Sequence, residues 1–176
     1  GRRFCVVTYH MPCLFGSDEK CQVMVAHVAL LMQSAQRFAG EDPLVVAGDF
    51  NFRPGTPSYD CVLRGSLDPG NSQHPPLPAP IICDGQWSPS FKPMRSAYLE
   101  AHGSEPVFTN FAWSEFNDSP FQETLDYLFL SSQWQVHTAE RLPAVSDVAH
   151  LPGFPSAEEP SDHLLVAANL RLSSSP

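Results

Sequence analysis

Four short groups of polar residues stand at or beside the ends of apolar, strand-like runs. They are Tyr9-His10, Gly48-Asp49-Phe50-Asn51, Leu125-Asp126-Tyr127 and Ser161-Asp162-His163. Because α/β proteins commonly build their sites from residues at strand ends, we expect these groups to meet. Carboxylates, imidazoles and an amide held together can position a water molecule and contact a phosphoryl oxygen. The combination therefore points to hydrolysis of a phosphate ester.

The spacing of Asp49 and Asn51 suits the handling of water. In an extended chain, a two-residue separation puts the carboxylate and the amide on the same face. The carboxylate can then orient a water molecule while the amide donates to a phosphoryl oxygen. The alternative is a plain turn, in which both side chains hydrogen-bond their own backbone.

Asp162 and His163 combine a hard oxygen ligand for Mg²⁺ with an imidazole that can stabilise developing negative charge. Asp126 lies inside an apolar run, where an unpaired carboxylate would cost stability. We expect it to pair with His163, which would fix the tautomer and raise the basicity of the other ring nitrogen. A structural ion pair and a polar cap before a strand are the alternatives.

Two further histidines, His10 and His27, are assigned different roles. His10, at a strand end, is either part of the site or a hydrogen-bonded histidine at the rim of the core. His27 occupies a core position of a predicted helix without polar neighbours, and we interpret it as structural.

Two helices are predicted. The first covers residues 20–38 and ends at Gly40. A second helix begins at Thr56 as its N-cap, with Pro57 in the first turn, and ends at Gly65. The inward-facing positions assigned to the first helix are Val23, His27, Leu30, Leu31, Ser34 and Phe38.

The remaining segments predict strands and loops. The strands are expected over residues 4–9, 43–48, 125–130, 134–142 and 163–170. Pro-rich segments at 66–93 and 143–161 predict extended surface loops. Strand, helix and strand in succession indicate an α/β layer.

The composition suits one globular domain over residues 1–176, with no stretch long and apolar enough to span a membrane. A formal net charge of −9 argues against a broad basic face, so a nucleic acid would need a local site, where bound divalent cations could supply positive charge. The five cysteines indicate free thiols in a reducing, intracellular compartment, with cytoplasm, nucleus and mitochondrion undistinguished.

In this order, the four groups resemble the signatures of the endonuclease/exonuclease/phosphatase superfamily. Its deadenylase, nocturnin and Angel branch is the most similar, through Ser96-Ala97-Tyr98 and residues 105–110, 121–129 and 155–163. The resemblance implies a four-layer α/β sandwich of mixed, largely antiparallel sheets. It also implies in-line attack of water on phosphorus with Mg²⁺, or Mn²⁺, as the cofactor.

The same resemblance implies roles for individual residues. Asp49 would orient or activate the water, and Asn51 and His10 would hold the phosphate. His163, steered by Asp126, would stabilise the transition state. The metal would be supported by Asp162, and the substrate-binding candidates are Asn110, Phe108, Phe111 and Trp113. The three aromatic residues are candidates for base stacking, with core packing as the alternative for at least two of them.

Two family features are absent from the sequence. Family members begin with a strand carrying an asparagine, followed by a glutamate that is the main metal ligand, and the chain matches neither. We therefore expect the C-terminal two-thirds or so of the family domain, with apolar sheet surface paired with an N-terminal segment or another chain.

Three functional hypotheses follow. The first is a 3′-5′ exoribonuclease of the deadenylase type, acting on RNA. The second is a hydrolase of small-molecule or lipid phosphodiesters, in keeping with the acidic charge. The third is a fragment or binding module that keeps the fold without hydrolysing a substrate, in keeping with the absent glutamate.

Overall fold

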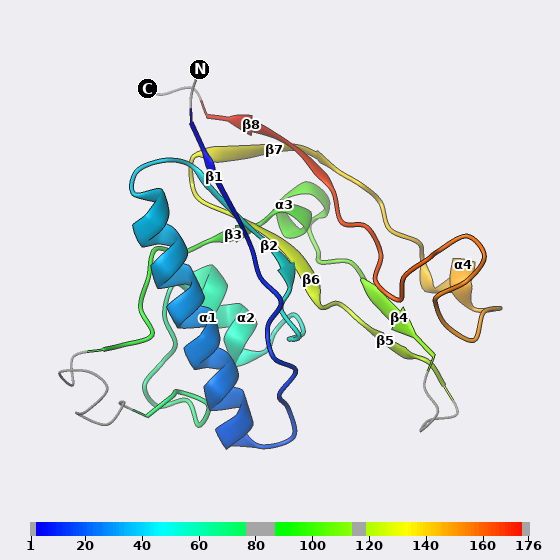
Figure 1. Ribbon diagram of the computed structural model, residues 1–176, viewed down its shortest axis with the longest axis horizontal. Helices are drawn as coiled ribbons and strands as arrows, with labels where there is room; N and C mark the ends of the chain where they lie inside the picture. Colours follow the sequence, from blue (N-terminus) through cyan, green and yellow to red (C-terminus); the bar gives the residue numbers. More distant parts are fainter. Residues whose placement is uncertain (1–2, 77–86, 114–118, 174–176) are drawn as a thin grey trace.

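A computed structural model describes residues 3–76, 87–113 and 119–173 of the chain. Its centre is a four-stranded sheet in the order β1-β2-β6-β3 (Figure 1). β1 runs parallel to β2, whereas β6 is antiparallel to both β2 and β3. These strands are β1 Cys5–Thr8, β2 Leu44–Asp49, β3 Arg95–Ser96 and β6 Asp126–Leu130. The pairing confirms the expected α/β class with mixed, largely antiparallel sheets.

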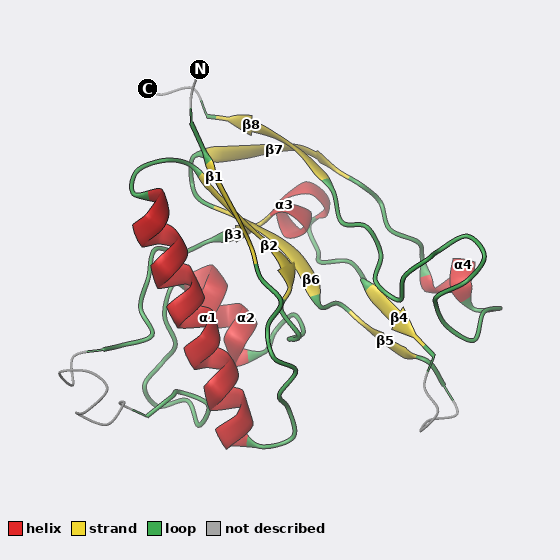
Figure 2. Ribbon diagram, in the orientation of Figure 1, coloured by secondary structure: helices red, strands yellow, loops and turns green. Residues whose placement is uncertain are grey.

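The parallel β1–β2 pair needs a crossover connection, which helix α1 (Asp18–Ala39) supplies. The Ser17 side chain caps its first turn by accepting the backbone N–H of Lys20. Gly40, at φ 59°, ends the helix as predicted. α1 lies along one face of the sheet beside α2 (Figures 1 and 2).

The predicted inner face of α1 was wrong by about one residue. Val23, Leu30 and Phe38 are 43%, 52% and 80% exposed. The sheet instead covers a neighbouring stripe rich in methionine and alanine, because small and flexible side chains let the helix approach closely. His27 is half-buried and its Nδ1 lies 3.2 Å from the Tyr9 hydroxyl, so it does have a polar neighbour. The buried stripe is Met24, Val25, Val28, Ala29, Met32, Ala35 and Ala39.

An aromatic cluster fills the space between the sheet and helix α2 (Pro57–Arg64), which Thr56 and Gly65 cap as predicted. Tyr127 and Phe129 of β6 stack with ring centroids 5.1 Å apart. The cluster holds the chain immediately after β2, because two of its members follow that strand directly. Its members are Phe50, Phe52, Tyr59, Tyr127 and Phe129.

The opposite face of the sheet packs against a second sheet and helix α3 (Figure 2). Val45 and Leu130 meet Ala97 and Trp134 in this layer. A separate hairpin, β4 with β5, extends beyond the carboxyl end of β2 (Figure 1). The elements are α3 Ala97–His102, β4 Asn110–Ala112, β5 Phe121–Glu123, β7 Trp134–Ala139, α4 Val145–Val148 and β8 Ala168–Leu172.

Several predicted boundaries need correction. The strand expected over 163–170 begins only at Ala168, because His163 and Leu164 instead lie along β4, with His163 bridged to Asn110. The loop expected over 143–161 contains α4. The loop expected over 66–93 has no helix or strand in its described parts, 66–76 and 87–93, and residues 77–86 lie outside the described residues.

Two composition-based expectations can be compared with the described part of the chain. No helix there has the length and hydropathy needed to cross a membrane. Among the same residues, Cys5, Cys13, Cys21 and Cys61 are free thiols. Cys83 lies outside the described residues.

The Gly48→Ala substitution should destabilise the protein by at least about 2 kcal/mol. Gly48 has φ +145°, and a Cβ there would lie 2.0 Å from the backbone oxygen of Tyr9, forcing β1 away from β2. Urea-induced unfolding measures the loss. Gly55→Ala is the matched control, because Gly55 also has a positive φ of 76° but nothing within 4 Å of its Cβ position. Equal losses in the two variants would contradict the argument.

Candidate active site

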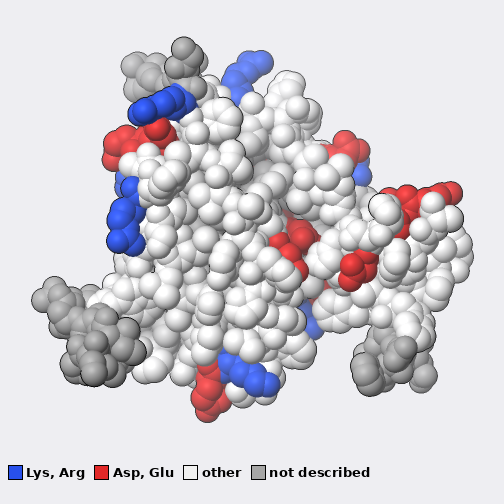
Figure 3. Space-filling view, in the orientation of Figure 1, with Lys and Arg blue, Asp and Glu red and all other residues white. Residues whose placement is uncertain are grey.

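The four polar groups meet where β1 and β2 end and β6 begins. Asp49 and Asp126 are directly opposite each other in the antiparallel β2–β6 pair. His10 follows β1, and the bridge between Asn110 and His163 brings the fourth group alongside. Figure 3 shows acidic side chains gathered in a hollow near the middle of this face, with lysine and arginine mostly toward its edges.

His163 and Asp126 form the pair expected from the sequence. The imidazole Nδ1 lies 2.8 Å from Asp126 Oδ2. This hydrogen bond is the main reason that the pKa of His163 lies above its ordinary value, with burial acting in the opposite direction and the charges of Asp126, Asp49 and Asp162 adding to the rise. The pair therefore favours an imidazolium whose Nε2 is free to face a substrate.

Thr109 holds Asp126 in place and was not identified from the sequence. Its hydroxyl donates to Asp126 Oδ2 at 2.7 Å and accepts the backbone N–H groups of Leu125 and Asp126, each at 2.9 Å. Thr109 is fully buried. Because these three bonds use the hydroxyl both as donor and as acceptor, they fix the carboxylate that orients His163.

Asp49 lies between the two histidines. Its Oδ2 is 3.4 Å from His10 Nε2 and 3.9 Å from His163 Nε2. Burial raises the pKa of Asp49, the N–H of Asn51 opposes that rise, and the charge of Asp126 adds to it. An oxygen atom about 2.8 Å from both Asp49 and His163 Nε2 would bridge the gap. Asp49 can therefore accept a proton from a water molecule held there.

Asn51 shapes the turn after β2. Its backbone N–H donates to Asp49 Oδ1 at 2.9 Å, and its side-chain amide donates to the Met11 carbonyl at 2.8 Å. Its φ of 50° is unusual for a residue other than glycine. The side-chain amide of Asn51 therefore keeps one N–H and its oxygen for a ligand. A plain turn explains the bond from the Asn51 backbone to Asp49 but not the bond from the amide to Met11.

Asp162 and Asn110 adjoin His163. The Asn110 amide donates to Asp162 Oδ2 at 3.3 Å, and the buried Asn110 Oδ1 has no hydrogen-bond partner in the structure. Among the described residues, no three His, Cys, Asp or Glu side chains are grouped to hold a metal ion. Mg²⁺ commonly uses one or two protein carboxylates and fills its remaining positions with water and phosphate, so the Asp162 carboxylate fits as one such ligand.

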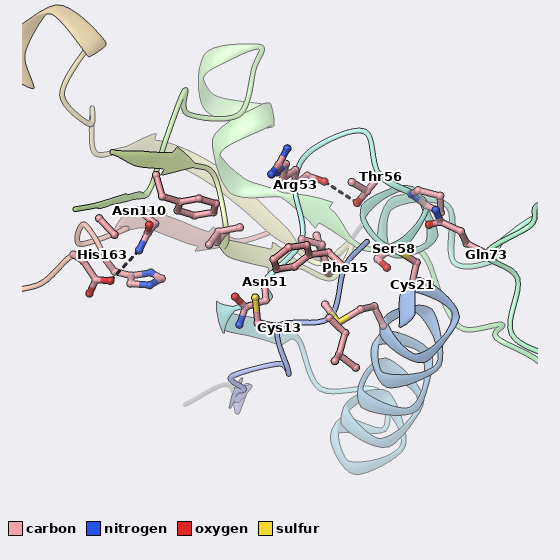
Figure 4. Close-up of a pocket in the computed structure, with 18 of the residues that line it drawn as sticks. Cys13, Phe15, Cys21, Asn51, Arg53, Thr56, Ser58, Gln73, Asn110 and His163 are labelled. Atoms are coloured by element: carbon pink, nitrogen blue, oxygen red, sulfur yellow. Dashed lines mark hydrogen bonds between the residues drawn. The ribbon is translucent and has the colours of Figure 1, made fainter. Parts of the chain in front are cut away.

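A cavity of about 850 Å³ opens beside these groups. Figure 4 shows Asn110 and His163 at one end, Thr56 and Gln73 at the other, and Phe15 and Asn51 between them. Its lining is mainly apolar, as in most small-molecule sites. The cavity gives a substrate direct access to Asp162 and His163, which also line it.

The aromatic candidates separate into two groups. Phe108 and Phe111 are 0% and 2% exposed and pack with Val148, Phe154 and Leu164, so base stacking is wrong for both. Trp113 is 57% exposed and lines the cavity, where it can contact a ligand. The sequence of 108–113 does not separate the two outcomes, because the burial of Phe108 and Phe111 comes from packing partners that are distant in sequence.

Positive charge is scarce at the cavity. Arg53 is the lone lysine or arginine among the described residues that line it, and its Nε lies 3.2 Å from Glu123 Oε1. Arg53 was not singled out in the sequence. Because its partner already neutralises part of its charge, the cavity has little capacity to hold a polyanion through phosphate contacts alone.

Comparisons with known proteins agree on one protein family. The model of the Endonuclease/Exonuclease/phosphatase family matches residues 23–163. The CCR4-Not complex 3′-5′-exoribonuclease subunit Ccr4 of Aspergillus fumigatus is 34% identical over 142 residues, covering 77% of this chain and 18% of that protein. Human 2′,5′-phosphodiesterase 12 is 26% identical over 174 residues, covering 97% of this chain and 26% of that protein.

Solved structures show the same fold. The human Nocturnin catalytic domain with bound sulfate has a TM-score of 0.60 at 24% identity, covering 98% of this chain and 48% of that chain. ANGEL2, described as a 2′,3′-cyclic phosphatase in complex with adenosine-2′,3′-vanadate, has a TM-score of 0.68 at 19% identity. The match covers 97% of this chain and 57% of that chain. The chain thus spans about half of these structures and a smaller share of the curated relatives.

Replacing Asp126 with asparagine should lower the pKa of His163, because the hydrogen bond to Asp126 is the largest cause of its rise. NMR titration of the imidazole in the wild type and in Asp126→Asn measures the change. A raised folded-state pKa contributes stability that is complete below the unfolded pKa, about 6.5, and lost as pH rises through the folded value. The stability that Asp126 adds through His163 should therefore decline as pH rises from about 6.5 through the folded-state pKa of His163. Identical titration curves would contradict the assignment.

Thr109→Val should lower the free energy of unfolding by about 1–3 kcal/mol, because two backbone N–H groups would lose their buried acceptor. Thr109→Ser is the matched control, since it keeps the hydroxyl and loses only a methyl group, at about 1 kcal/mol. Urea-induced unfolding compares the two variants. Equal stability of the valine and serine variants would show that the hydroxyl does not hold this strand end.

Proposed function

Because the chain belongs to the Endonuclease/Exonuclease/phosphatase family, we propose that it hydrolyses RNA from the 3′ end as a deadenylase-type exoribonuclease. The observation that carries the proposal is the His163–Asp126 pair, whose free Nε2 faces the Asp49 carboxylate across 3.9 Å. The direction of attack and the RNA substrate are supported by Ccr4, which is named a 3′-5′-exoribonuclease.

In the proposed reaction, the oxygen of a water molecule bonds to the phosphorus of the last phosphodiester. The bond between that phosphorus and the 3′-oxygen of the preceding nucleotide breaks. Asp49 takes a proton from the attacking water, and a proton is returned to the leaving 3′-oxygen. The products are a nucleoside 5′-monophosphate and an RNA shorter by one nucleotide.

The other side chains act on the phosphate. The His163 imidazolium, held by Asp126 and Thr109, stabilises negative charge on a non-bridging oxygen in the transition state. His10, 78% exposed, and the free amide hydrogen of Asn51 hold the phosphate on the other side. The site therefore needs little movement to bind a phosphodiester, because these groups already converge.

We also propose that Mg²⁺, or Mn²⁺, assists the reaction. The Asp162 carboxylate would provide one ligand oxygen, beside His163. When bound, the cation would offset the negative charge that Asp49, Asp126 and Asp162 bring to the phosphate. Its contribution is tested by omitting divalent cations and adding EDTA.

A small phosphodiester is the second candidate substrate. Arg53 is the one lysine or arginine among the described lining residues, and its pairing with Glu123 favours this alternative over a long polyanion. Human 2′,5′-phosphodiesterase 12 is named for a 2′,5′-phosphodiester, so that linkage is also a candidate. Steep weakening by salt would indicate a polyanionic substrate, whereas shallow weakening would indicate a small one.

Asp49→Asn and His163→Ala should each lower kcat by at least about 100-fold, because both residues act in the transition state. The assay follows 5′-labelled oligo(A) and mixed-sequence RNA in Mg²⁺, Mn²⁺ or EDTA, and a ladder shortening from the 3′ end is the expected product. Circular dichroism verifies that each variant is folded.

His150→Ala is the matched control, because this histidine is exposed and does not line the cavity. It should retain wild-type activity. RNA left intact by the folded wild-type chain in both metals would contradict the proposal for this chain, and full activity of either site variant would remove that residue from the mechanism.

A further inference from the structure

Glu105 is a partly buried acidic residue that the proposed reaction does not use. It lies between α3 and β4 and does not line the cavity beside His163. Among the described residues, no lysine, arginine or histidine forms an ion pair with it. A carboxylate taken partly out of water without a cation costs stability unless hydrogen bonds satisfy it. Hydrogen-bond donors must therefore hold this side chain in its charged form.

Two hydroxyl groups from different elements bond the Glu105 carboxylate. The Tyr59 hydroxyl of α2 donates to Oε1 at 2.7 Å, and the Ser96 hydroxyl, at the start of α3, donates to the same carboxylate. Burial raises the pKa of Glu105, and these two bonds oppose that rise. Both donors are buried, and bonds to a charged acceptor are stronger than those to a neutral one. Glu105 therefore ties α2, the start of α3 and the chain after α3 together at one point.

The segment that starts at this point leads directly to the active site. Residues 105–110 connect α3 with β4, and the segment ends with Thr109 and Asn110. Its second residue, Pro106, has a restricted φ, and its carbonyl accepts the buried Thr124 hydroxyl at 2.6 Å. The first two residues of the segment are therefore held in place, as are the last two.

The placement of Thr109 and Asn110 depends on this segment. The Thr109 hydroxyl donates to Asp126 Oδ2 at 2.7 Å, and the Asn110 amide donates to Asp162 Oδ2 at 3.3 Å. Four residues of extended chain span at most about 14 Å, so Glu105 fixes a point close to both contacts. A displacement of about 1 Å in a catalytic group can lower a rate about 100-fold. A small shift at the start of the segment is therefore enough to disturb the site.

We propose that Glu105 is a positioning residue of the active site. By fixing the start of segment 105–110, it keeps Thr109 in place to hold Asp126. The effect of Glu105 on catalysis rests on the proposed function, whereas its effect on the Thr109 contact is measurable without hydrolysis. The alternative is that Glu105 stabilises the whole fold, and it predicts an equal effect throughout the central sheet.

Amide hydrogen exchange followed by NMR tests the positioning role. The N–H groups of Leu125 and Asp126 report the Thr109 contact, because both donate to its hydroxyl. The N–H of Val46, in the middle of β2, reports unfolding of the sheet. Tyr59→Phe keeps the ring and removes one donor to the carboxylate. Relative to the exchange of Val46, it should speed the exchange of the two strand-end amides at least about 5-fold.

Glu105→Gln is the second variant. It keeps the size of the side chain and one acceptor oxygen but removes the charge, so the bonds from the two hydroxyl groups weaken. The same selective increase should appear, at about 3-fold or more. Glu140→Gln is the matched control, because this glutamate is exposed and lies outside segment 105–110, and it should leave the relative rates unchanged. Equal acceleration of the strand-end amides and Val46, or no acceleration in either variant, would overturn the positioning role.

Kinetics separate this inference from the proposed function. With oligo(A) as substrate, Tyr59→Phe and Glu105→Gln should each lower kcat at least about 5-fold and leave KM within about 2-fold, because neither residue lines the cavity. The double variant should stay within about 2-fold of the weaker single variant, because both changes act on one hydrogen bond. Selective exchange in both variants, with no hydrolysis of any RNA by the wild type, would support the positioning role and refute the proposed function. RNA hydrolysis with kcat unchanged in both variants would support the function and refute the positioning role.

Discussion

The antiparallel register between β2 and β6 is the constraint on which the site depends. It places Asp49 opposite Asp126, so two carboxylates occupy the end of one strand pair. A shift of one residue would turn each side chain to the other face of the sheet. The aromatic cluster prevents that shift, because Phe129 and Tyr127 must remain against Phe50 and Phe52. The same packing that stabilises the fold thus sets the geometry of the two carboxylates.

Two neighbouring carboxylates raise an electrostatic difficulty that the surrounding groups resolve in different ways. Asp126 is satisfied by Thr109 and His163, which donate to its Oδ2. Asp49 receives one backbone N–H from Asn51 and otherwise faces histidines at 3.4 and 3.9 Å. Asp126 is therefore committed to orientation, whereas Asp49 keeps an oxygen for water. This difference in environment, rather than in residue type, distinguishes their proposed roles.

The sequence predicted the parts of the fold with strong local signals. The Thr56 cap, the glycines that end the two helices and the buried apolar runs are local signals, and both helices and most of the strands were confirmed. The extended chain assumed for the spacing of Asp49 and Asn51 was wrong, because Asn51 lies in a turn with a φ of 50°. The prediction of the buried face of α1 was wrong, because two apolar stripes lie side by side on that helix. Only contact with the sheet determines which stripe is buried. Asp126 and His163 pair as expected, because an isolated carboxylate inside an apolar strand demands a partner.

The site residues that escaped prediction act through contacts distant in sequence. Thr109 contacts Asp126 across 17 positions, and nothing around Thr109 distinguishes it from a core threonine. Phe15 resembles any exposed turn residue until the cavity is known. Both become interpretable only when the β4–β5 hairpin and the β1–α1 turn are placed on either side of the carboxylates. The hairpin contributes Asn110 and Trp113, and the turn contributes Phe15.

The acidic groups at the strand ends and the apolar cavity beside them suit different tasks. An acidic centre suits the activation of water but repels a phosphate, so attraction must come from a cation or from parts of the substrate that carry no charge. The apolar cavity can contact uncharged parts of a substrate. It lies directly beside the acidic groups, since Asp162 and His163 also line it. Under the proposed function, binding energy gained in the apolar cavity, away from the reacting atoms, would hold the phosphate where the carboxylates otherwise disfavour it. In the proposed reaction, a site with so few positive charges would therefore take affinity from its apolar wall and transition-state stabilisation from the His163 imidazole.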